Sequence, residues 1–217
     1  IEGPRANSIY SLAFSPDSRL LAYGLVDGTV RLWSKQAGQE TGVLEGHTER
    51  VLCVSFSPDG KWLASGAHDL TVRVWKIETG QELWKGEVND SVNSVCWSPD
   101  SSVLFSRSSN SASGLRFWHA DTGRTVHGLP QKEEQSDIYW ATRALAVSSS
   151  GKLLVTYSPE NLRILEMWDI SVLCAKPDFE QSVSVSASTY STTFSPHLRT
   201  LPLSHPCPGR TAPWDSA

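Results

Sequence analysis

Several features that would define other classes of protein are missing from this chain of 217 residues. No stretch approaches the roughly 18 apolar residues that a membrane helix needs, and no charged segment followed by an apolar one opens the chain. The cysteines form no Cys-x-x-Cys pair and have no histidine pair at metal-ligand spacing; they are Cys53, Cys96, Cys174 and Cys207. We therefore expect an intracellular protein, cytoplasmic or nuclear, that has reduced thiols, no membrane contact and no metal or other cofactor.

Charge is also sparse. The formal net charge is −4 and no cluster of Lys and Arg stands out, so we do not expect nucleic acid to be a partner. What the chain does have is 39% hydrophobic residues, Gly and Pro spread along its length, and nine Trp. Many short strands joined by tight turns need this composition, which favours an all-β fold.

An internal repeat is the strongest signal in the sequence. An apolar residue followed by a Ser-Pro-Asp turn begins the segments FSPDSRLLAYG, FSPDGKWLASG and WSPDSSVLFSR, and a looser copy reads VSSSGKLLVTY. The segments begin at Phe14, Phe56, Trp97 and Val147, which are 42, 41 and 50 residues apart. A second series ends at Trp33, Trp75, Trp118 and Trp168, with steps of 42, 43 and 50 residues. Two independent anchors therefore share one period.

Apolar residues between these anchors are spaced as in strands. Ile9, Leu12 and Phe14 of the first repeat are matched by Val51, Val54 and Phe56, and then by Val92, Val95 and Trp97. Each triplet is followed by a reverse turn, a second short apolar run, another turn, and the run that ends in Trp. One repeat is therefore predicted to form a small antiparallel sheet.

The pattern resembles the WD repeat, whose length is about 40 to 45 residues. The second repeat is most similar: it opens at Gly46-His47, turns at Ser57-Pro58-Asp59-Gly60 and closes with the run Asp69 to Trp75. The resemblance implies an all-β propeller of four-stranded antiparallel blades, here about four of them in an incomplete ring. We expect blades at about 3–45, 46–86, 87–130 and 131–178, within a propeller region 1–178.

In WD repeats a His, a Ser or Thr, an Asp and the Trp are often joined by hydrogen bonds. The resemblance assigns these roles to His47, Ser65, Asp69 and Trp75. Such a network fixes one arrangement of strands and loops because unpaired buried polar groups are costly. Other repeats keep only part of it: Asp27 and Trp33 in the first, Ser106 and Trp118 in the third, and Thr156 and Trp168 in the fourth. Tyr23 stands at the Ser position of the first repeat, and Glu87 near the His position of the third.

Protein-binding residues are expected on the face called top, which carries the loop that enters each blade and the loop between its two middle strands. The connection 131–140 is longer than its counterparts, and recognition commonly resides in elaborated loops on a rigid scaffold. Its candidates are Lys132, Glu133, Glu134, Tyr139 and Trp140. The loop 107–114 adds Arg107, and the matching turn of the second repeat adds His68.

Three functions follow as hypotheses. The leading one is a scaffold that binds other proteins or peptides and performs no catalysis. A second is the sensor propeller of a larger nucleotide-binding signalling protein. The third is a propeller hydrolase, because Ser65, His47 and Asp69 are the residue types of a catalytic triad, although no Gly-x-Ser-x-Gly motif surrounds the Ser. Residues 179–217, rich in Ser and Thr and then in Pro, are expected to be a disordered tail, a remnant of a fifth blade, or a partner-binding segment.

Overall fold

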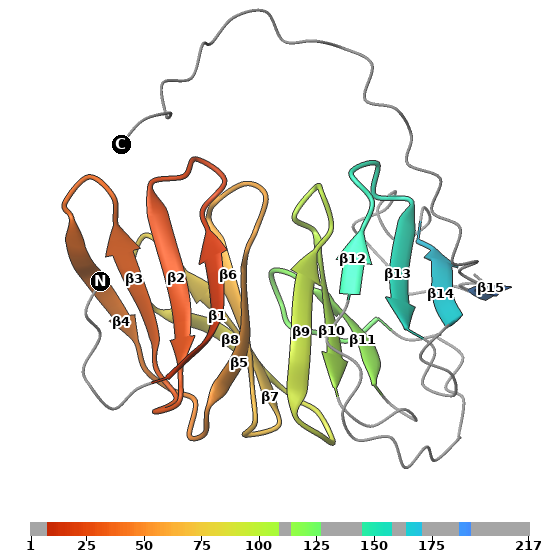
Figure 1. Ribbon diagram of the computed structural model, residues 1–217, viewed down its shortest axis with the longest axis horizontal. Coiled ribbons are helices and arrows are strands. Elements are labelled where there is room, and N and C mark those ends of the chain that lie inside the picture. Colours follow the sequence, from red (N-terminus) through yellow and green to blue (C-terminus); the bar gives the residue numbers. More distant parts are fainter. Residues whose placement is uncertain (1–7, 109–113, 127–144, 158–163, 171–186, 192–217) are drawn as a thin grey trace, which may run out of the picture.

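A computed structural model describes residues 8–108, 114–126, 145–157, 164–170 and 187–191. Within these residues every regular element is a strand, and the strands form four antiparallel sheets (Figure 1). This confirms the all-β fold built from repeated antiparallel sheets. No helix in the described part of the chain is long and apolar enough to cross a bilayer.

The first and second sheets each contain four strands that pair in chain order. The first consists of β1 (Ile9–Phe14), β2 (Leu20–Leu25), β3 (Val30–Ser34) and β4 (Gln39–Leu44). The second consists of β5 (Val51–Phe56), β6 (Trp62–Ala67), β7 (Thr71–Lys76) and β8 (Glu82–Glu87). Their registers are the same: Phe14 pairs with Leu21 as Phe56 pairs with Leu63.

The third and fourth sheets repeat this order. The third has three strands among the described residues, which are β9 (Val92–Trp97), β10 (Val103–Ser108) and β11 (Leu115–His119). The fourth consists of β12 (Leu145–Val147), β13 (Leu153–Tyr157), β14 (Ile164–Asp169) and β15 (Ala187–Ser191).

Strand β15 lies in the segment 179–217 that the sequence predicted to be a tail. It pairs with β14, with Ala187 opposite Trp168 and Ser191 opposite Ile164, and so completes the fourth sheet. The expectation of a tail is therefore wrong for residues 187–191. Thr and Tyr favour strands, but the segment Ala187–Ser191 has only one large side chain, Tyr190, and so gives no periodic signal.

The Ser-Pro-Asp turns are built in the same way in three sheets. Ser15 Oγ donates to Asp17 at 2.6 Å and accepts from the Leu20 amide at 2.9 Å, and the Asp17 carboxylate accepts from the Arg19 amide at 3.0 Å. Ser57 with Asp59 and Ser98 with Asp100 repeat these contacts. These local bonds satisfy the turn backbone and explain why the tripeptide recurs.

The core lies between neighbouring sheets. Ala22, Val30 and Leu32 of the first sheet pack against Val51, Val54 and Phe56 of the second. Trp84 of the second sheet stacks on Trp118 of the third, with ring centroids 5.8 Å apart, and donates from Nε1 to the Ala120 carbonyl at 2.8 Å. The second and third sheets therefore each bury one apolar face against the sheet before and the other against the sheet after.

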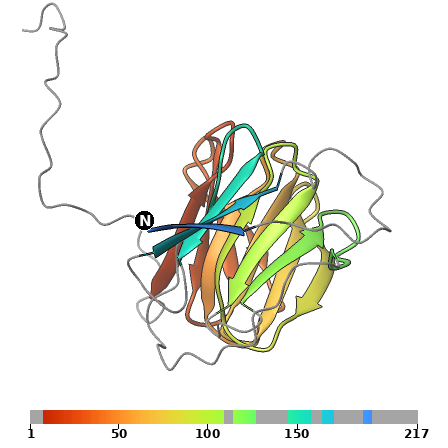
Figure 2. The same cartoon turned by 90° about the vertical axis from the view of Figure 1, so that its right-hand side faces the viewer.

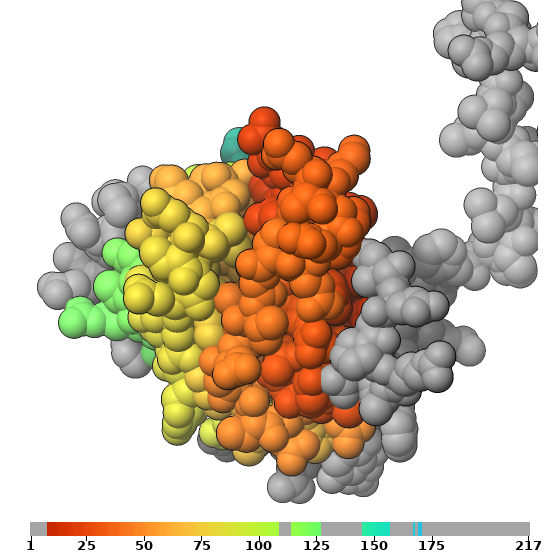
Figure 3. Space-filling model, turned by 90° about the vertical axis from the view of Figure 1, so that its left-hand side faces the viewer, coloured from red at the N-terminus to blue at the C-terminus, as the bar shows by residue number. Residues whose placement is uncertain are grey.

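The innermost strands β1, β5, β9 and β12 follow one another, so the sheets form a row with the first and fourth at its ends (Figure 1). The view from the right shows the fourth sheet in front of the others (Figure 2), and the opposite view shows the first sheet beside the outer strand of the second (Figure 3). The four described sheets do not close a ring.

Candidate functional site

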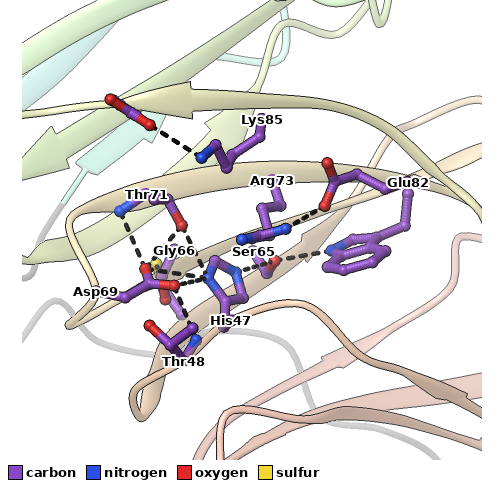
Figure 4. Close-up of polar contacts among 12 residues, drawn as sticks. His47, Thr48, Ser65, Gly66, Asp69, Thr71, Arg73, Glu82 and Lys85 are labelled. Atoms are coloured by element: carbon purple, nitrogen blue, oxygen red, sulfur yellow. Dashed lines mark hydrogen bonds and ion pairs between the residues drawn. The ribbon is translucent and has the colours of Figure 1, made fainter.

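The network expected in the second sheet is present in the geometry (Figure 4). Trp75 Nε1 donates to Ser65 Oγ at 2.8 Å, and Ser65 Oγ lies 2.8 Å from His47 Nε2. His47 Nδ1 lies 2.9 Å from one carboxylate oxygen of Asp69. His47 enters from the loop between the first two sheets, Ser65 lies on β6, and Trp75 lies on β7.

The direction of these bonds follows from the donors and acceptors available. The indole N–H can only donate, and the Asp69 carboxylate can only accept. Ser65 Oγ therefore accepts the hydrogen bond from the indole N–H and donates its own hydroxyl hydrogen to His47 Nε2. His47 Nδ1–H then donates to Asp69, so all four side chains are satisfied in one sequence of bonds.

Asp69 is the anchor of the network at the top face. Besides His47 it accepts from the Thr71 hydroxyl at 2.7 Å, the Thr71 amide at 3.1 Å and the Thr48 amide at 3.1 Å. Burial raises the pKa of Asp69, but the hydrogen bonds from His47 and Thr71 outweigh it and hold the pKa well below the usual range. The carboxylate thus ties the loop that enters the second sheet to the β6–β7 turn.

The first sheet is tied differently. Tyr23, at the register position of Ser65, donates its hydroxyl hydrogen to Glu40, and Arg31 donates to the other oxygen of Glu40 at 3.0 Å. Burial, and then the hydrogen bond to Glu40, raise the pKa of Tyr23 to about 12. Asp27 accepts from the Thr29 amide and hydroxyl within its own turn, and Trp33 is half-buried.

The third sheet keeps part of the network. Trp118 Nε1 donates to Ser106 Oγ at 2.8 Å. Glu87, which the sequence placed near the histidine position, instead pairs across the sheet with Thr71 and forms an ion pair of 2.9 Å with Lys85. In the fourth sheet Thr156 is buried, and Trp168 pairs with Leu154 in the strand register.

An arginine–glutamate pair was missed by the sequence analysis. Arg31 pairs with Glu40 in the first sheet, and Arg73 pairs with Glu82 in the second, in each case across the two outer strands. The signal was available, because both pairs are nine residues apart and both glutamates follow a Gly-Gln dipeptide. In the third repeat Thr125 takes the place of the glutamate.

The candidate binding residues fare differently. His68 is exposed in the β6–β7 turn, as expected. Arg107 does not begin an exposed loop: it lies in β10 opposite Leu115 and is only 4% exposed, so its expected position on a loop is wrong. By register it takes the position of Gly24 and Gly66 in the first two sheets. The connection 131–140, with Lys132, Glu133, Glu134, Tyr139 and Trp140, lies outside the described residues.

The top face of the first two sheets is continuous. A side chain at Gly28 would come within 2.5 Å of the His47 carbonyl, so the β2–β3 turn lies against the loop entering the second sheet. The His68 amide donates to the Arg50 carbonyl at 3.0 Å and joins that loop to the β6–β7 turn. Exposed apolar side chains on these turns are Val26 and Leu70. No group of three or more His, Cys, Asp or Glu suited to a metal ion occurs in the described parts of the chain.

Comparison with known families agrees with this architecture. The pattern of the WD domain, G-beta repeat, matches residues 1–34 and 38–76, and that of the anaphase-promoting complex subunit 4 WD40 domain matches residues 79–167. The chain belongs to the WD-repeat family. Such repeats typically mediate protein–protein interaction and are generally not catalytic.

The fold is similar to that in the crystal structure of the computationally designed Ika4 protein. The TM-score is 0.63 and the sequence identity 24%, and the match covers 78% of this chain and 94% of the designed chain. At this identity the likeness concerns the fold alone. No curated protein sequence matches the chain.

Proposed function

We propose that the chain is a non-catalytic scaffold that binds other proteins or peptides through the loops of its top face. One observation carries the proposal: Ser65, His47 and Asp69, the residue types of a triad, are committed to holding strands and loops together. Ser65 is 0% exposed, and its Oγ is bonded to both Trp75 and His47.

A hydrolase would need a different arrangement. A catalytic serine must present its oxygen to a substrate carbonyl while a histidine removes its proton. Ser65 Oγ accepts from the Trp75 indole inside the sheet, and Ser65 is fully buried, so its oxygen is not presented to a substrate. The network therefore supports a structural role and argues against the hydrolase hypothesis.

The proposed binding surface lies on the turns of the first two sheets. It contains Val26, His68 and Leu70, and the loop 45–50 joins them. Exposed apolar and aromatic side chains on a rigid support are the usual anchors of protein recognition. The surface is held by Asp69, so its loops need little ordering when a partner binds. The longer connection 131–140 adds Tyr139 and Trp140 as predicted anchors.

The experiment compares affinity capture of native partners by the wild-type chain and by top-face variants. Leu70 has a φ of 64°, a left-handed conformation that Asn adopts more easily than Leu. Leu70→Asn therefore removes the apolar side chain without straining the turn. We expect this variant, combined with His68→Ala, to lose captured partners, as should Trp140→Ala.

The matched control is Ser18→Asn. Ser18 is also exposed, lies in a turn of the opposite face, and has a φ of 59°. Capture that survives the top-face changes but is lost with Ser18→Asn would assign binding to the opposite face. Turnover in an esterase and peptidase screen that Ser65→Ala abolishes would instead establish a hydrolase. An intracellular location remains part of the proposal.

A further inference from the structure

Charged side chains are distributed unequally between the two faces of the described sheets. The described turns of the face that carries the Ser-Pro-Asp turns contain as many Lys and Arg as Asp and Glu. The described turns and connections of the top face are 26–29, 45–50, 68–70 and 88–91, and among their residues Arg50 is the one Lys or Arg. The same segments contain five carboxylates, which we call the top carboxylates: Asp27, Glu45, Glu49, Asp69 and Asp90.

The two faces also differ in how their carboxylates are neutralised. On the opposite face Arg19 lies 3.7 Å from Asp17, and Lys61 lies 3.2 Å from Asp59. On the top face Glu45 and Glu49 are exposed and form no ion pair with the described residues. Negative charge on the top face is therefore not compensated locally, and such a surface attracts cationic partners and accelerates their association.

An exposed apolar side chain lies among these carboxylates. Leu70 in the β6–β7 turn is 41% exposed and has a φ of 64°. The same position of the first sheet is Gly28, with a φ of 86°. The left-handed region costs Leu free energy that Gly does not lose, and an exposed side chain gains little burial to offset it. The stability of the fold therefore does not explain Leu70, whereas contact with a partner does.

Hydrogen bonds place carboxylate-bearing connections on both sides of the turn that holds Leu70. The Leu70 carbonyl accepts from the Val88 amide at 2.9 Å, which joins the turn to the connection 88–91 and its Asp90. On the other side the turn is joined through His68 to the connection 45–50, which contains Glu49. This part of the top face belongs to the second sheet, and the sheets before and after it are both described.

We propose that the top face around Leu70 binds a protein segment in which Lys or Arg stands beside a large apolar residue. The apolar side chain of the partner packs on Leu70, and its cations meet the top carboxylates. Lys and Arg suit both contacts, because their apolar stems can cover Leu70 while their charged ends reach a carboxylate. This inference rests on the proposed scaffold function and adds to it the chemistry of the partner.

Selection of random peptides displayed on phage, with the whole 217-residue chain as the immobilised target, tests that chemistry. We expect the selected peptides to be enriched in Lys and Arg next to large apolar residues. Selected peptides without this enrichment would overturn the inference and leave the scaffold function standing. If no peptide is selected, the inference is also wrong, and if native partners are not captured either, the proposed function fails with it.

Charge-neutral variants locate the binding. With a selected basic peptide as the probe, Glu49→Gln combined with Asp90→Asn should raise the Kd about tenfold at low salt, since each exposed charge pair contributes modestly. The dependence of the Kd on salt should also become weaker. The matched control is Glu78→Gln with Asp121→Asn, which changes the net charge equally on exposed turns of the opposite face. An equal loss of affinity in the control pair would show that binding follows net charge alone and would overturn the inference.

Leu70→Asn separates a binding role from a structural one. Asn adopts the left-handed conformation more easily than Leu, so the variant should melt at the same temperature as the wild type or at a higher one. Its Kd for the selected peptide should nevertheless rise about tenfold, as expected when an apolar anchor is lost from a contact. Unchanged affinity, or a lower melting temperature that accounts for the weaker binding, would overturn the role of Leu70.

Discussion

Trp118 donates its indole hydrogen to Ser106 Oγ at 2.8 Å, the same distance at which Trp75 donates to Ser65. The two bonds take the same place in consecutive sheets, between the two middle strands. In the second sheet His47 extends the contact to Asp69, whereas Glu87 makes no such extension in the third. The Trp–Ser bond is therefore common to the second and third sheets, and the contacts of His47 occur in the second sheet.

This relationship predicts unequal effects of removing the two serines. Ser65→Ala should lower the free energy of unfolding by about 1–3 kcal/mol, because it leaves both the Trp75 indole and His47 Nε2 without this partner. Ser106→Ala should lower the free energy of unfolding by less, because it leaves the indole N–H of Trp118 without this partner and does not affect a histidine. Urea unfolding of both variants measures the difference, and an equal or larger loss for Ser106→Ala would contradict it.

Removing two other members of the network, Trp75 and His47, gives a second prediction. Trp75→Ala should cost about 3–5 kcal/mol as a buried aromatic side chain lost from a core. His47→Ala should cost about 1–3 kcal/mol as a buried hydrogen-bond partner lost. Thermal unfolding is a sufficient measurement. An unchanged melting temperature for His47→Ala would show that the network does not stabilise the fold.

Acid should weaken the network through Asp69. A carboxyl group whose pKa is lower in the folded state than in the unfolded state, where it is about 3.9, stabilises the fold above that value. This contribution is lost as the pH falls from about 4 toward the lower folded value. The wild type should therefore lose more stability between pH 5 and pH 2 than Asp69→Asn does. Asp17→Asn, in an exposed turn, is the control, and a difference as large for that variant would assign the effect elsewhere.

Because neighbouring sheets pack closely at Gly66, we expect this position to tolerate no side chain. A Cβ atom there would lie 2.3 Å from Val92 Cγ1 in the next sheet and 2.7 Å from Cys53 Sγ. Gly66→Ala should therefore destabilise the fold by about 1–3 kcal/mol, as overpacking does in other cores. Gly42→Ala is the control, because a Cβ there meets Leu32 at an ordinary 3.5 Å. Differential scanning calorimetry of Gly66→Ala and Gly42→Ala measures the loss of stability. Similar melting temperatures would show that the interface between the second and third sheets can open to admit a methyl group.

Much of the fold was predictable because each repeat contains sequence markers at fixed positions. The Ser-Pro-Asp turns and the tryptophans mark both ends of each hairpin, so the strands at Ile9–Phe14 and Val51–Phe56 were placed correctly. Strand β15 was not, because Ala187–Ser191 has neither marker and is ordered by pairing with β14. Local propensity cannot reveal a pairing that tertiary contacts decide.

The site was predictable to a similar degree and for similar reasons. His47, Ser65, Asp69 and Trp75 stand at motif positions, and the structure brings them together. Arg107 was misplaced because a charged residue after an apolar run looks like the start of a loop. In the fold Arg107 lies at a buried position, and the equivalent residues of the first two sheets are Gly24 and Gly66. Only knowledge of the register shows that equivalence.

The chain order within the sheets has a consequence for how the protein acquires its structure. In the first two sheets each strand pairs only with its neighbours in sequence, and the first sheet meets the second through β5, the next strand to follow it. Pairing between strands that are neighbours in sequence forms quickly, and a repeat array can begin folding at one unit and extend to its neighbours. During synthesis the first sheet could therefore assemble on the ribosome before the second has been translated, and each later sheet would fold against a surface that is already in place.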